Sequence, residues 1–598
     1  MLGKRGAQRG LFEADNQYLE AVGKESFYAF LAGLRGVLFR DEEFAHLYVQ
    51  NNGRPSVPPS LLATALLLQA HDRVSDEEAK ERADFDVRWK VALGITVEAH
   101  PFAKSTLQLF RAQLVVHDAA RMVFRKSLEL AKKQGFLKQN RKLRLALDTT
   151  NILGRGAVKD TYNLLGDGIV LLLRQLAHLA GAELAAFATE LGYARYVGEQ
   201  SLKGGAELDW DNAKERARLL AEIVADADRL LAEARKVQKT LPSGRPEALA
   251  LTKAAELLSQ VLLQDIVRSE EGAELRDGVA KDRMPSVHDP EMRHGRKSAQ
   301  KRFNGHKAQI AVDTDEQLVT AVTVLAGNAP DSEQALAMVD ETEQNTGSEV
   351  AETVADCAYG SGATRQEFAK ADRRLVAKVA FMRNGDGFPK TEFTIDMATE
   401  TCVCPAGKAG LARYHKAAEE SSEAGERAQA RQLRGFVFEA ATCAACPLRA
   451  KCVRGAGGRS IAVHPQEALL QQARAFQLSP EFGEYRKARQ AAEHRLARLV
   501  QLGIRQARYV GRKKTLFQLL MAATVANLTL LASKGNWEGL VEGPSGLLLA
   551  VLALGTLTLA AYTPSARPWS PIFAAAPTRR PCGVPFLRDL PQPPNSLI

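Results

Sequence analysis

Two features of secreted and membrane proteins are missing from this sequence. Cysteine is scarce, with seven in 598 residues, which excludes a disulfide-stapled framework. The N-terminal stretch MLGKRGAQRGLFEADNQ lacks the apolar core of a signal peptide. An apolar run near the end, Leu547 to Tyr562, is shorter than the about 20 residues that cross a bilayer. We therefore expect a cytoplasmic protein with no membrane partner.

The bulk composition indicates a multidomain globular protein with a basic surface. A chain of 598 residues exceeds what one compact core usually holds, so several domains are expected. Hydrophobic residues make up 45% and charged residues 25%, as in ordinary globular proteins. The net charge of +10 and the pI of about 9.1 favour a polyanionic partner such as nucleic acid. Charge alone leaves that partner open, because many basic proteins bind no nucleic acid.

Two long stretches carry helical patterns. Residues 26–135 read as short helices, one of them starting at Ser75 with Glu78 as its capping-box partner. This region is either a DNA-binding helical domain or an ordinary one. Residues 163–270 contain two apolar stripes at helical spacing on either side of the break Leu241 to Pro246. They predict an antiparallel helical hairpin inserted into the chain.

Strand patterns surround these helices and bring in two acidic residues. Residues 141–148 alternate apolar and polar positions and end in Asp148, and a short apolar strand leads into Asp356. Residues 305–313 and 317–325 read as a β-hairpin. Because open sheets place their chemistry at strand ends, Asp148 and Asp356 are candidate functional carboxylates.

A third carboxylate, Glu493, lies in a basic helical segment. It is the only acid among eight cations between Arg489 and Lys514. It is either an intrahelical ion-pair partner or the third member of a metal-binding set. DNA phosphoryl transfer without a covalent enzyme intermediate uses two metal ions about 3.5–4 Å apart, and Mg²⁺ prefers carboxylate oxygens. Asp148, Asp356 and Glu493 would then hold two Mg²⁺ ions per active site.

The clustered cysteines form a second candidate metal site. Cys404, Cys443, Cys446 and Cys452 have the spacing C-x38-C-x2-C-x5-C, with Cys402 as a possible substitute for Cys404. Four thiolates fit one structural Zn²⁺, and CxxC is a common half-site. The alternative is a group of reduced cysteines packed in a small β insert.

Basic side chains near Glu493 are the candidate DNA contacts. Phosphate contacts of this kind position DNA without reading its sequence. The alternative for each basic stretch is a solvated protein face. A second basic stretch, His294 to Arg302, is a further candidate. The candidates in the Glu493 segment are Tyr485, Arg489, Arg495, Arg498, Arg505, Arg508, Arg512, Lys513 and Lys514.

The motifs together resemble those of bacterial insertion-sequence transposases of the DDE type, over roughly residues 25–535. The stretches GRPSVPPSLLATALLLQ, SDEEAKERADFDVRWKVALG and STLQLFRAQL are similar to the helical domain before the catalytic core. LALDTTNILGRGAVKDTYNLL and TVADCAYGS resemble the two Asp segments. The segment from Tyr485 to Leu528 resembles the Glu segment, and CPAGK and CAACPLRAKC are similar to Cys-rich segments of the same family.

The resemblance implies an RNase H-like fold with Asp148, Asp356 and Glu493 as the catalytic triad and with Mg²⁺ or Mn²⁺ as the metal, two ions per active site. It also implies cut-and-paste transposition on double-stranded DNA, at the terminal inverted repeats and the target, by a homodimer. The expected setting is the bacterial cytoplasm, at the nucleoid. Tyr485 and Arg489 match a Tyr-Arg-Glu-Lys pattern with one extra residue between them, and the usual Lys is Val500. The alternative functions are a non-catalytic or a nuclease-only DNA-binding protein derived from a transposase.

The expected fold class is α/β, an RNase H-like mixed sheet with an N-terminal all-α domain and two insertions. Residues 1–135 form the DNA-binding helical domain. Residues 136–162, 276–394 and 463–535 form the catalytic core. Residues 163–275 form the helical insertion, 395–462 the Cys-rich insertion and 536–598 a tail.

Overall fold

The computed structural model describes residues 1–6, 12–49, 53–138, 141–242, 244–270, 272–298, 300–381, 383–415 and 433–534. The chain divides into two compact units, Met1–Val541 and Glu542–Ile598. The second unit lies outside the described residues, and so does the apolar run Leu547 to Tyr562.

The N-terminal region is helical, as predicted. Ser75 accepts a hydrogen bond from the Glu78 amide at 3.1 Å and its own amide donates to Glu78 at 2.9 Å, which confirms the capping box. The helices are α1 (Ala14–Val22), α2 (Phe27–Gly33), η1 (Asp41–Leu47), α3 (Pro59–Asp72), α4 (Asp76–Phe85), α5 (Val87–Leu93), α6 (Lys104–Val116) and α7 (Ala120–Lys133).

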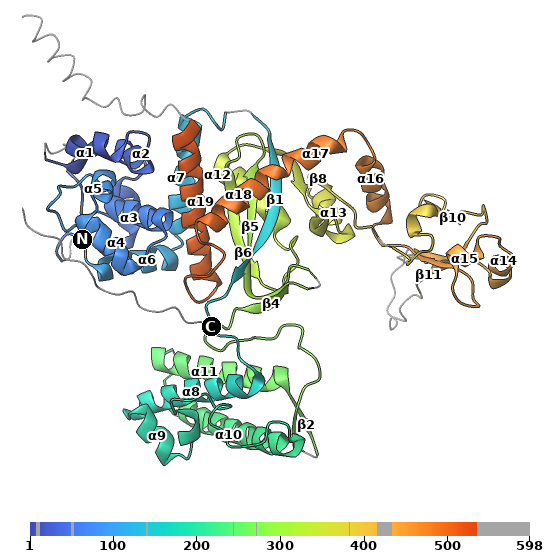
Figure 1. Ribbon diagram of the computed structural model, residues 1–598, viewed down its shortest axis with the longest axis horizontal. Helices are drawn as coiled ribbons and strands as arrows, with labels where there is room; N and C mark the ends of the chain where they lie inside the picture. The colour runs from blue at the N-terminus through green and yellow to red at the C-terminus, as the bar shows by residue number, and fades with distance from the viewer. Residues whose placement is uncertain are drawn as a thin grey trace, which may run out of the picture. The chain divides into compact units, whose positions relative to one another are not determined.

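A six-stranded mixed sheet forms the centre of the core (Figure 1). Its order is β4-β5-β1-β7-β8, with β6 also on β5; β1, β7 and β8 are parallel, and the other pairings are antiparallel. This arrangement confirms the predicted RNase H-like mixed sheet. The strands are β1 (Leu143–Leu153), β4 (Arg293–Arg296), β5 (Arg302–Asp313), β6 (Val319–Ala326), β7 (Val350–Ala355) and β8 (Arg374–Ala377).

Strand β5 is long enough to take two partners on one edge. Its start pairs with β4 up to Gly305, and the rest pairs with β6 from His306 onward. Gly305 lies where the partner changes, with φ +152°, and a Cβ there would stand 2.1 Å from the carbonyl oxygen of Ile152. The basic stretch His294 to Arg302 is therefore the β4–β5 hairpin rather than a free loop.

Helices from distant parts of the sequence pack beside the sheet (Figure 1). Helix α18 packs against β1 and β5, and α19 packs against β6, α7 and α3. The start of the basic helical segment that contains Glu493 is formed by two helices that meet at Arg489. These helices are α12 (Ala335–Thr346), η3 (Cys357–Tyr359), α13 (Gly362–Lys370), α16 (Glu467–Gln477), α17 (Phe482–Ala488), α18 (Gln490–Gln501) and α19 (Arg512–Lys534).

Helix α19 has the length and apolar composition of a membrane span, but most of it is buried within the protein. Its Asn527 side chain accepts from the amide of Val319 on β6 at 2.9 Å and donates to the carbonyl oxygen of the same residue at 2.8 Å. These contacts are those of a core helix fixed to the sheet.

The predicted helical hairpin is formed by α10 and α11. Helix α8 packs against both, so the insertion is a small bundle with an apolar core of its own. Two apolar stripes predict the hairpin, whereas the third helix does not follow from them. The elements are α8 (Thr161–Ala180), α9 (Leu184–Glu190), η2 (Ala194–Tyr196), α10 (Ala213–Thr240), α11 (Pro246–Asp265), β2 (Ile266–Ser269) and β3 (Gly272–Leu275).

The Cys-rich region consists of two small sheets and short helices. Phe393, Phe436 and Phe438 are buried in its own apolar cluster. Its sheets have the orders β10-β9 and β11-β12-β13. The elements are η4 (Lys390–Glu392), β9 (Thr394–Asp396), β10 (Thr401–Val403), β11 (Leu411–Tyr414), β12 (Leu433–Val437), α14 (Ala440–Ala444), α15 (Arg449–Cys452) and β13 (Ser460–Ala462).

Candidate active site and cysteine-lined pocket

Asp148 and Asp356 lie on neighbouring parallel strands. Leu147 of β1 is in register with Ala355 of β7, and each is followed directly by one of the two aspartates. Neighbouring strands are about 4.8 Å apart, so the two Cα positions are adjacent. The prediction that both strands end at their aspartate is right for β7 and wrong for β1. Strand β1 continues to Leu153 because β5 remains paired with it beyond Asp148.

The Asp148 carboxyl group lies in a negative and partly desolvated environment. Its pKa is raised to about 6, mainly by burial and in addition by the charges of Asp356 and Glu493. The amide of Thr149, which donates to Oδ1 at 2.7 Å, and the Arg489 guanidinium act in the opposite direction. The two other predicted carboxylates are thus close enough to Asp148 for their charges to affect its ionisation.

Glu493 lies in the first turn of α18 with an exposed side chain. The guanidinium of Arg489 donates to its Oε1, four residues back along the chain. The sequence left two alternatives for Glu493, an ion-pair partner or a member of the acidic set. The structure contains the ion pair, and it also places Glu493 within electrostatic range of Asp148.

The three carboxylates have separate partners in this structure. Asp148 accepts from the Thr149 amide, Asp356 accepts from the Ala358 amide at 2.9 Å, and Glu493 accepts from Arg489. In the described part of the chain, no three His, Cys, Asp or Glu side chains converge closely enough to hold a metal ion. As a donor set, three carboxylates suit a hard oxygen-seeking cation such as Mg²⁺ or Mn²⁺. A cation would also offset the repulsion between these carboxylates, which adds to burial in raising the pKa of Asp148.

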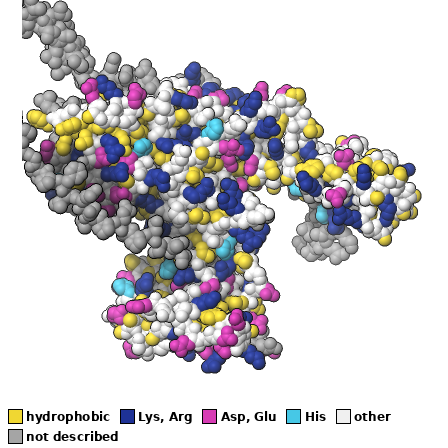
Figure 2. Space-filling model, viewed as in Figure 1, with side chains coloured by type: hydrophobic (Ala, Val, Ile, Leu, Met, Phe, Trp, Pro, Cys, Tyr) yellow, Lys and Arg dark blue, Asp and Glu magenta, His cyan; other side chains and the backbone are white. Residues whose placement is uncertain are grey.

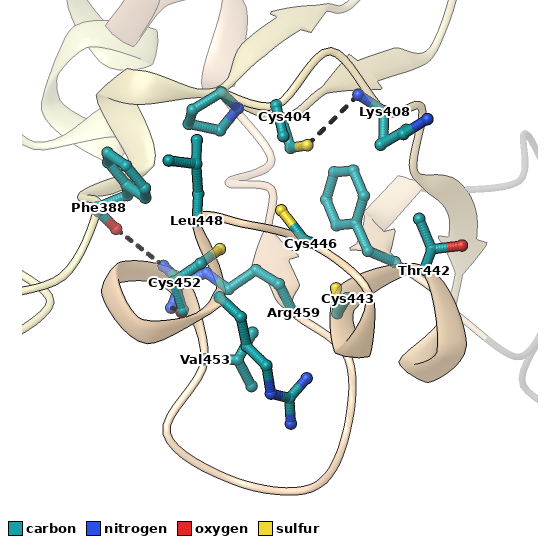
Figure 3. A pocket seen from close by; sticks show the side chains of 14 residues that line it. Phe388, Cys404, Lys408, Thr442, Cys443, Cys446, Leu448, Cys452, Val453 and Arg459 are labelled. Atoms are coloured by element: carbon teal, nitrogen blue, oxygen red, sulfur yellow. Dashed lines mark hydrogen bonds between the residues drawn. The ribbon is translucent and has the colours of Figure 1, made fainter.

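The four predicted zinc ligands line one small cavity in the Cys-rich region (Figure 3). Its volume is about 20 Å³, enough for about one water-sized particle. The amide of Lys408 donates to the Cys404 sulfur at 3.4 Å. Burial raises the pKa of Cys452, Arg459 lowers it, and the other three thiols raise it further. The residues of this group are Cys404, Cys443, Cys446 and Cys452.

Cys402 does not line this cavity. Its side chain is fully buried in the apolar cluster of the region, and burial raises its thiol pKa to about 11. Cys404 packs against the same cluster but also lines the cavity, so the two residues differ in their access to it. The geometry favours Cys404 over Cys402 as the fourth member of the set.

Family comparisons agree with this picture at two places along the chain. Residues 18–113 match the family described as "Transposase domain (DUF772)", and residues 403–532 match "Transposase DDE domain". Both matched regions are transposase domains, and one of them is of the DDE type. The second match includes all four cavity cysteines, Glu493 and nearly all of α19. No curated protein and no solved structure matches the chain significantly.

Two of the transposase's predicted DNA contacts are buried. The Tyr485 hydroxyl donates to Glu352 of β7 at 2.9 Å. The Arg495 guanidinium donates to the carbonyl oxygen of Ala526 in α19, and burial, with Arg498 nearby, lowers its pKa to about 10. Both side chains pack inside the protein, so neither is available to contact DNA.

Two others bind to neighbouring parts of the transposase. Arg505 donates to Thr150 at 3.0 Å and to the Asn151 side chain at 2.6 Å, which fixes its loop to the end of β1. Arg508 is half-buried, 3.6 Å from Asp76 of α4. These contacts connect the segment after α18 with the sheet and with the N-terminal helices.

The remaining cations are more accessible. Arg498 is half-buried and donates to Gln501 at 3.4 Å, and the exposed Arg512 pairs with Glu291 at 3.4 Å. Lys513 and Lys514 are exposed in the first turn of α19. Of the predicted DNA contacts, Lys513 and Lys514 are the two that DNA could reach directly.

The β4–β5 hairpin carries a second group of exposed cations, Arg296, Lys297, Lys301 and Arg302. Lys and Arg side chains gather around this hairpin on the face shown in Figure 2. Strand β5 of the hairpin continues along β1, and Ile310 of β5 is in register with Asp148. The hairpin is thus joined directly to the strand pair that carries the first aspartate.

Proposed function

We propose that this transposase cuts and joins DNA at the ends of its own insertion sequence, with Asp148, Asp356 and Glu493 as the catalytic carboxylates. The main support is the register of β1 and β7, which brings the two aspartates side by side. Glu493 is supported as the third catalytic carboxylate because its charge, like that of Asp356, contributes to the raised pKa of Asp148.

The three carboxylates would hold two Mg²⁺ or Mn²⁺ ions, which would supply activation of the attacking oxygen and stabilisation of the leaving oxygen. Asp148 has a pKa near 6, so it is largely ionised at neutral pH yet poorly stabilised without a counter-charge. Arg489 supplies part of that counter-charge and pairs with the Glu493 carboxylate. The protein would thereby keep a negative site ready for cations.

The direct test is an excision assay with the native element ends. Asp148→Ala, Asp356→Ala and Glu493→Ala should each reduce cleavage to background while DNA binding is kept. Glu484→Ala, an exposed acid on α17, is the matched control and should cleave as wild type does. Cleavage retained in one of the three variants would remove that residue from the site. Cleavage by the wild type without joining would indicate a nuclease-only protein, and binding without cleavage a non-catalytic one.

The proposed partner is double-stranded DNA, at the terminal inverted repeats and at the target, bound by a homodimer in the cytoplasm. The exposed cations Lys513 and Lys514 and those of the β4–β5 hairpin would contact phosphates. The helical region of residues 1–135 would supply the sequence-reading element.

We also propose one structural Zn²⁺ bound by Cys404, Cys443, Cys446 and Cys452. The support is that all four thiols surround one cavity of about 20 Å³. A closed four-thiolate site stabilises a small fold and leaves no open position for catalysis.

Metal analysis of the purified full chain tests the zinc site. About one zinc per chain is expected, and Cys443→Ser should lose most of it. Cys357→Ser, an exposed cysteine outside the cavity, should keep it. Equal zinc content in both variants, or none in the wild type, would contradict the proposal.

A further inference from the structure

The Tyr485 side chain is enclosed by charged groups on the sheet. Its hydroxyl donates to Glu352 Oε2 at 2.9 Å, and both residues are buried. The guanidinium of Arg144 lies 5.1 Å from the centre of its ring, and that of Arg374 lies 5.5 Å away. Burial and the Glu352 carboxylate both raise the pKa of Tyr485, so the hydroxyl remains a donor. The tyrosine is held through its ring and its hydroxyl together.

The three charged partners form one row across three parallel strands. Glu352 of β7 is in register with Arg144 of β1 on one side and with Arg374 of β8 on the other. Arg144 donates to Glu352 Oε1 at 2.5 Å, and Arg374 lies 3.5 Å from Oε2. Glu352 is the buried member of the row and contacts both arginines and Tyr485, whereas Arg144 is half-buried and Arg374 is exposed. Loss of the Tyr485 hydroxyl would leave this buried carboxylate with one partner fewer, so the Tyr485–Glu352 contact is the fixed point of the row.

This row lies on the same side of the sheet as the two aspartates. Side chains alternate along a strand, so residues four apart share a face. Asp148 is four residues beyond Arg144, and Asp356 is four residues beyond Glu352. Val354, which lies between Glu352 and Asp356 on the same face of β7, packs in one apolar cluster with Tyr485. Tyr485 therefore lies on the face that carries Glu352 and Asp356.

The spacing along the helices matches the spacing along the strand. Four residues of β7 from Glu352 to Asp356 extend about 13 Å. Tyr485 of α17 and Glu493 of α18 are eight residues apart, and Arg489 between the two helices keeps α-helical backbone angles, so their helical rise is at most about 12 Å. Tyr485 is held at Glu352, and Glu493 lies close enough to Asp148 for its charge to raise the Asp148 pKa. The chain from Tyr485 to Glu493 therefore spans a distance like that from Glu352 to Asp356.

We propose that Tyr485 is a positioning residue, which the Arg144–Glu352–Arg374 row fixes to the sheet so that α18 presents Glu493 to Asp148 and Asp356. This inference rests on the proposed function, because it assumes that the three carboxylates share metal ions. It assigns Tyr485 a role inside the protein in place of a DNA contact.

The test is the metal dependence of cleavage by Tyr485→Phe, which keeps the ring and removes only the hydroxyl. We expect DNA affinity within about twofold of wild type. The Mn²⁺ or Mg²⁺ concentration for half-maximal cleavage should rise about 10-fold, as for other groups that orient metal ligands. Saturating Mn²⁺ should restore most of the rate. Glu352→Gln is the second variant and should shift the metal dependence in the same direction.

Tyr196→Phe is a matched control in the helical insertion. Tyr196 is also buried, donates to a buried carboxylate, Asp226, at 2.6 Å and has a guanidinium, that of Arg195, over its ring. Its replacement should affect stability without changing the metal dependence. An unchanged metal dependence in Tyr485→Phe, or weaker DNA binding with normal metal dependence, would overturn the proposal. Absence of metal-dependent cleavage in the wild type would instead contradict the proposed function itself.

Discussion

At the scale of single residues, the carboxyl group of Asp148 is the most informative. Its pKa rises from 3.8 to about 6, first because of burial and then because of Asp356 and Glu493. The folded state therefore binds the Asp148 proton more tightly than the unfolded state. The stabilisation that this tighter proton binding gives the folded state is fully present below pH 3.8. It is lost as the pH rises from 3.8 to about 6, because the carboxyl group then loses its proton. An arrangement that favours metal binding thus destabilises the metal-free fold.

Asp148→Asn should consequently raise the unfolding temperature in metal-free buffer at about pH 7.5. The rise in the Asp148 pKa from 3.8 to about 6 corresponds to at most about 3 kcal/mol, reduced by the partial exposure of the carboxylate. The gain should shrink as the pH falls toward about 4, where the wild-type carboxyl group is protonated in the folded state. Calorimetry with EDTA at several pH values measures this. A gain that does not vary with pH, or no gain near neutral pH, would contradict the electrostatic description.

At the scale of elements, features that depend on a local sequence pattern could be predicted. Features that depend on which strands and helices pair with one another could not. The Ser75 capping box and the β5–β6 hairpin were predictable because their signals lie within a few residues. The end of β1 was not, since β5 prolongs it beyond Asp148. The charge of Arg495 suggested a surface role, but α19 covers its guanidinium.

The candidate site shows the same division. The two strand aspartates and the cysteine group could be selected from residue type and spacing. Nothing local indicated that Glu352 would receive the Tyr485 hydroxyl, because the two residues lie 133 positions apart. The one available signal was that Glu352 precedes Asp356 by four residues and so shares its face of β7. Likewise, the choice between Cys402 and Cys404 required knowing which thiol faces the cavity.

The β4–β5 hairpin leads to a prediction at this scale. Replacing Arg296, Lys297, Lys301 and Arg302 together with Gln should lower the salt dependence of DNA binding. The slope of log K against log salt should decrease by about 0.9 for each DNA phosphate that the variant no longer neutralises. Titrations at several salt concentrations measure the slope. An equal number of exposed cations on α10 serves as control, namely Lys214, Arg218, Arg235 and Lys239. Equal slopes for the two sets would exclude the hairpin as a DNA-binding element.

At the scale of the whole molecule, distant segments are assembled around one sheet. The first aspartate precedes the helical insertion, the second follows it, and the glutamate comes after the Cys-rich region. Both insertions have apolar cores of their own, so they lengthen the chain without interrupting the packing of the sheet. Helix α19 contacts the N-terminal helices α3 and α7 as well as β6, which joins the N-terminal region to the core. The proposed activity depends on three carboxylates meeting despite these separations.

Manganese binding measured by electron paramagnetic resonance tests that claim most directly. With element-end DNA present, wild type should bind about two Mn²⁺ per active site. Asp148→Ala should bind markedly fewer at the same free Mn²⁺ concentration, while it keeps its DNA. Equal Mn²⁺ binding by the two proteins would contradict the shared site, because Asp148 would then not be one of its ligands.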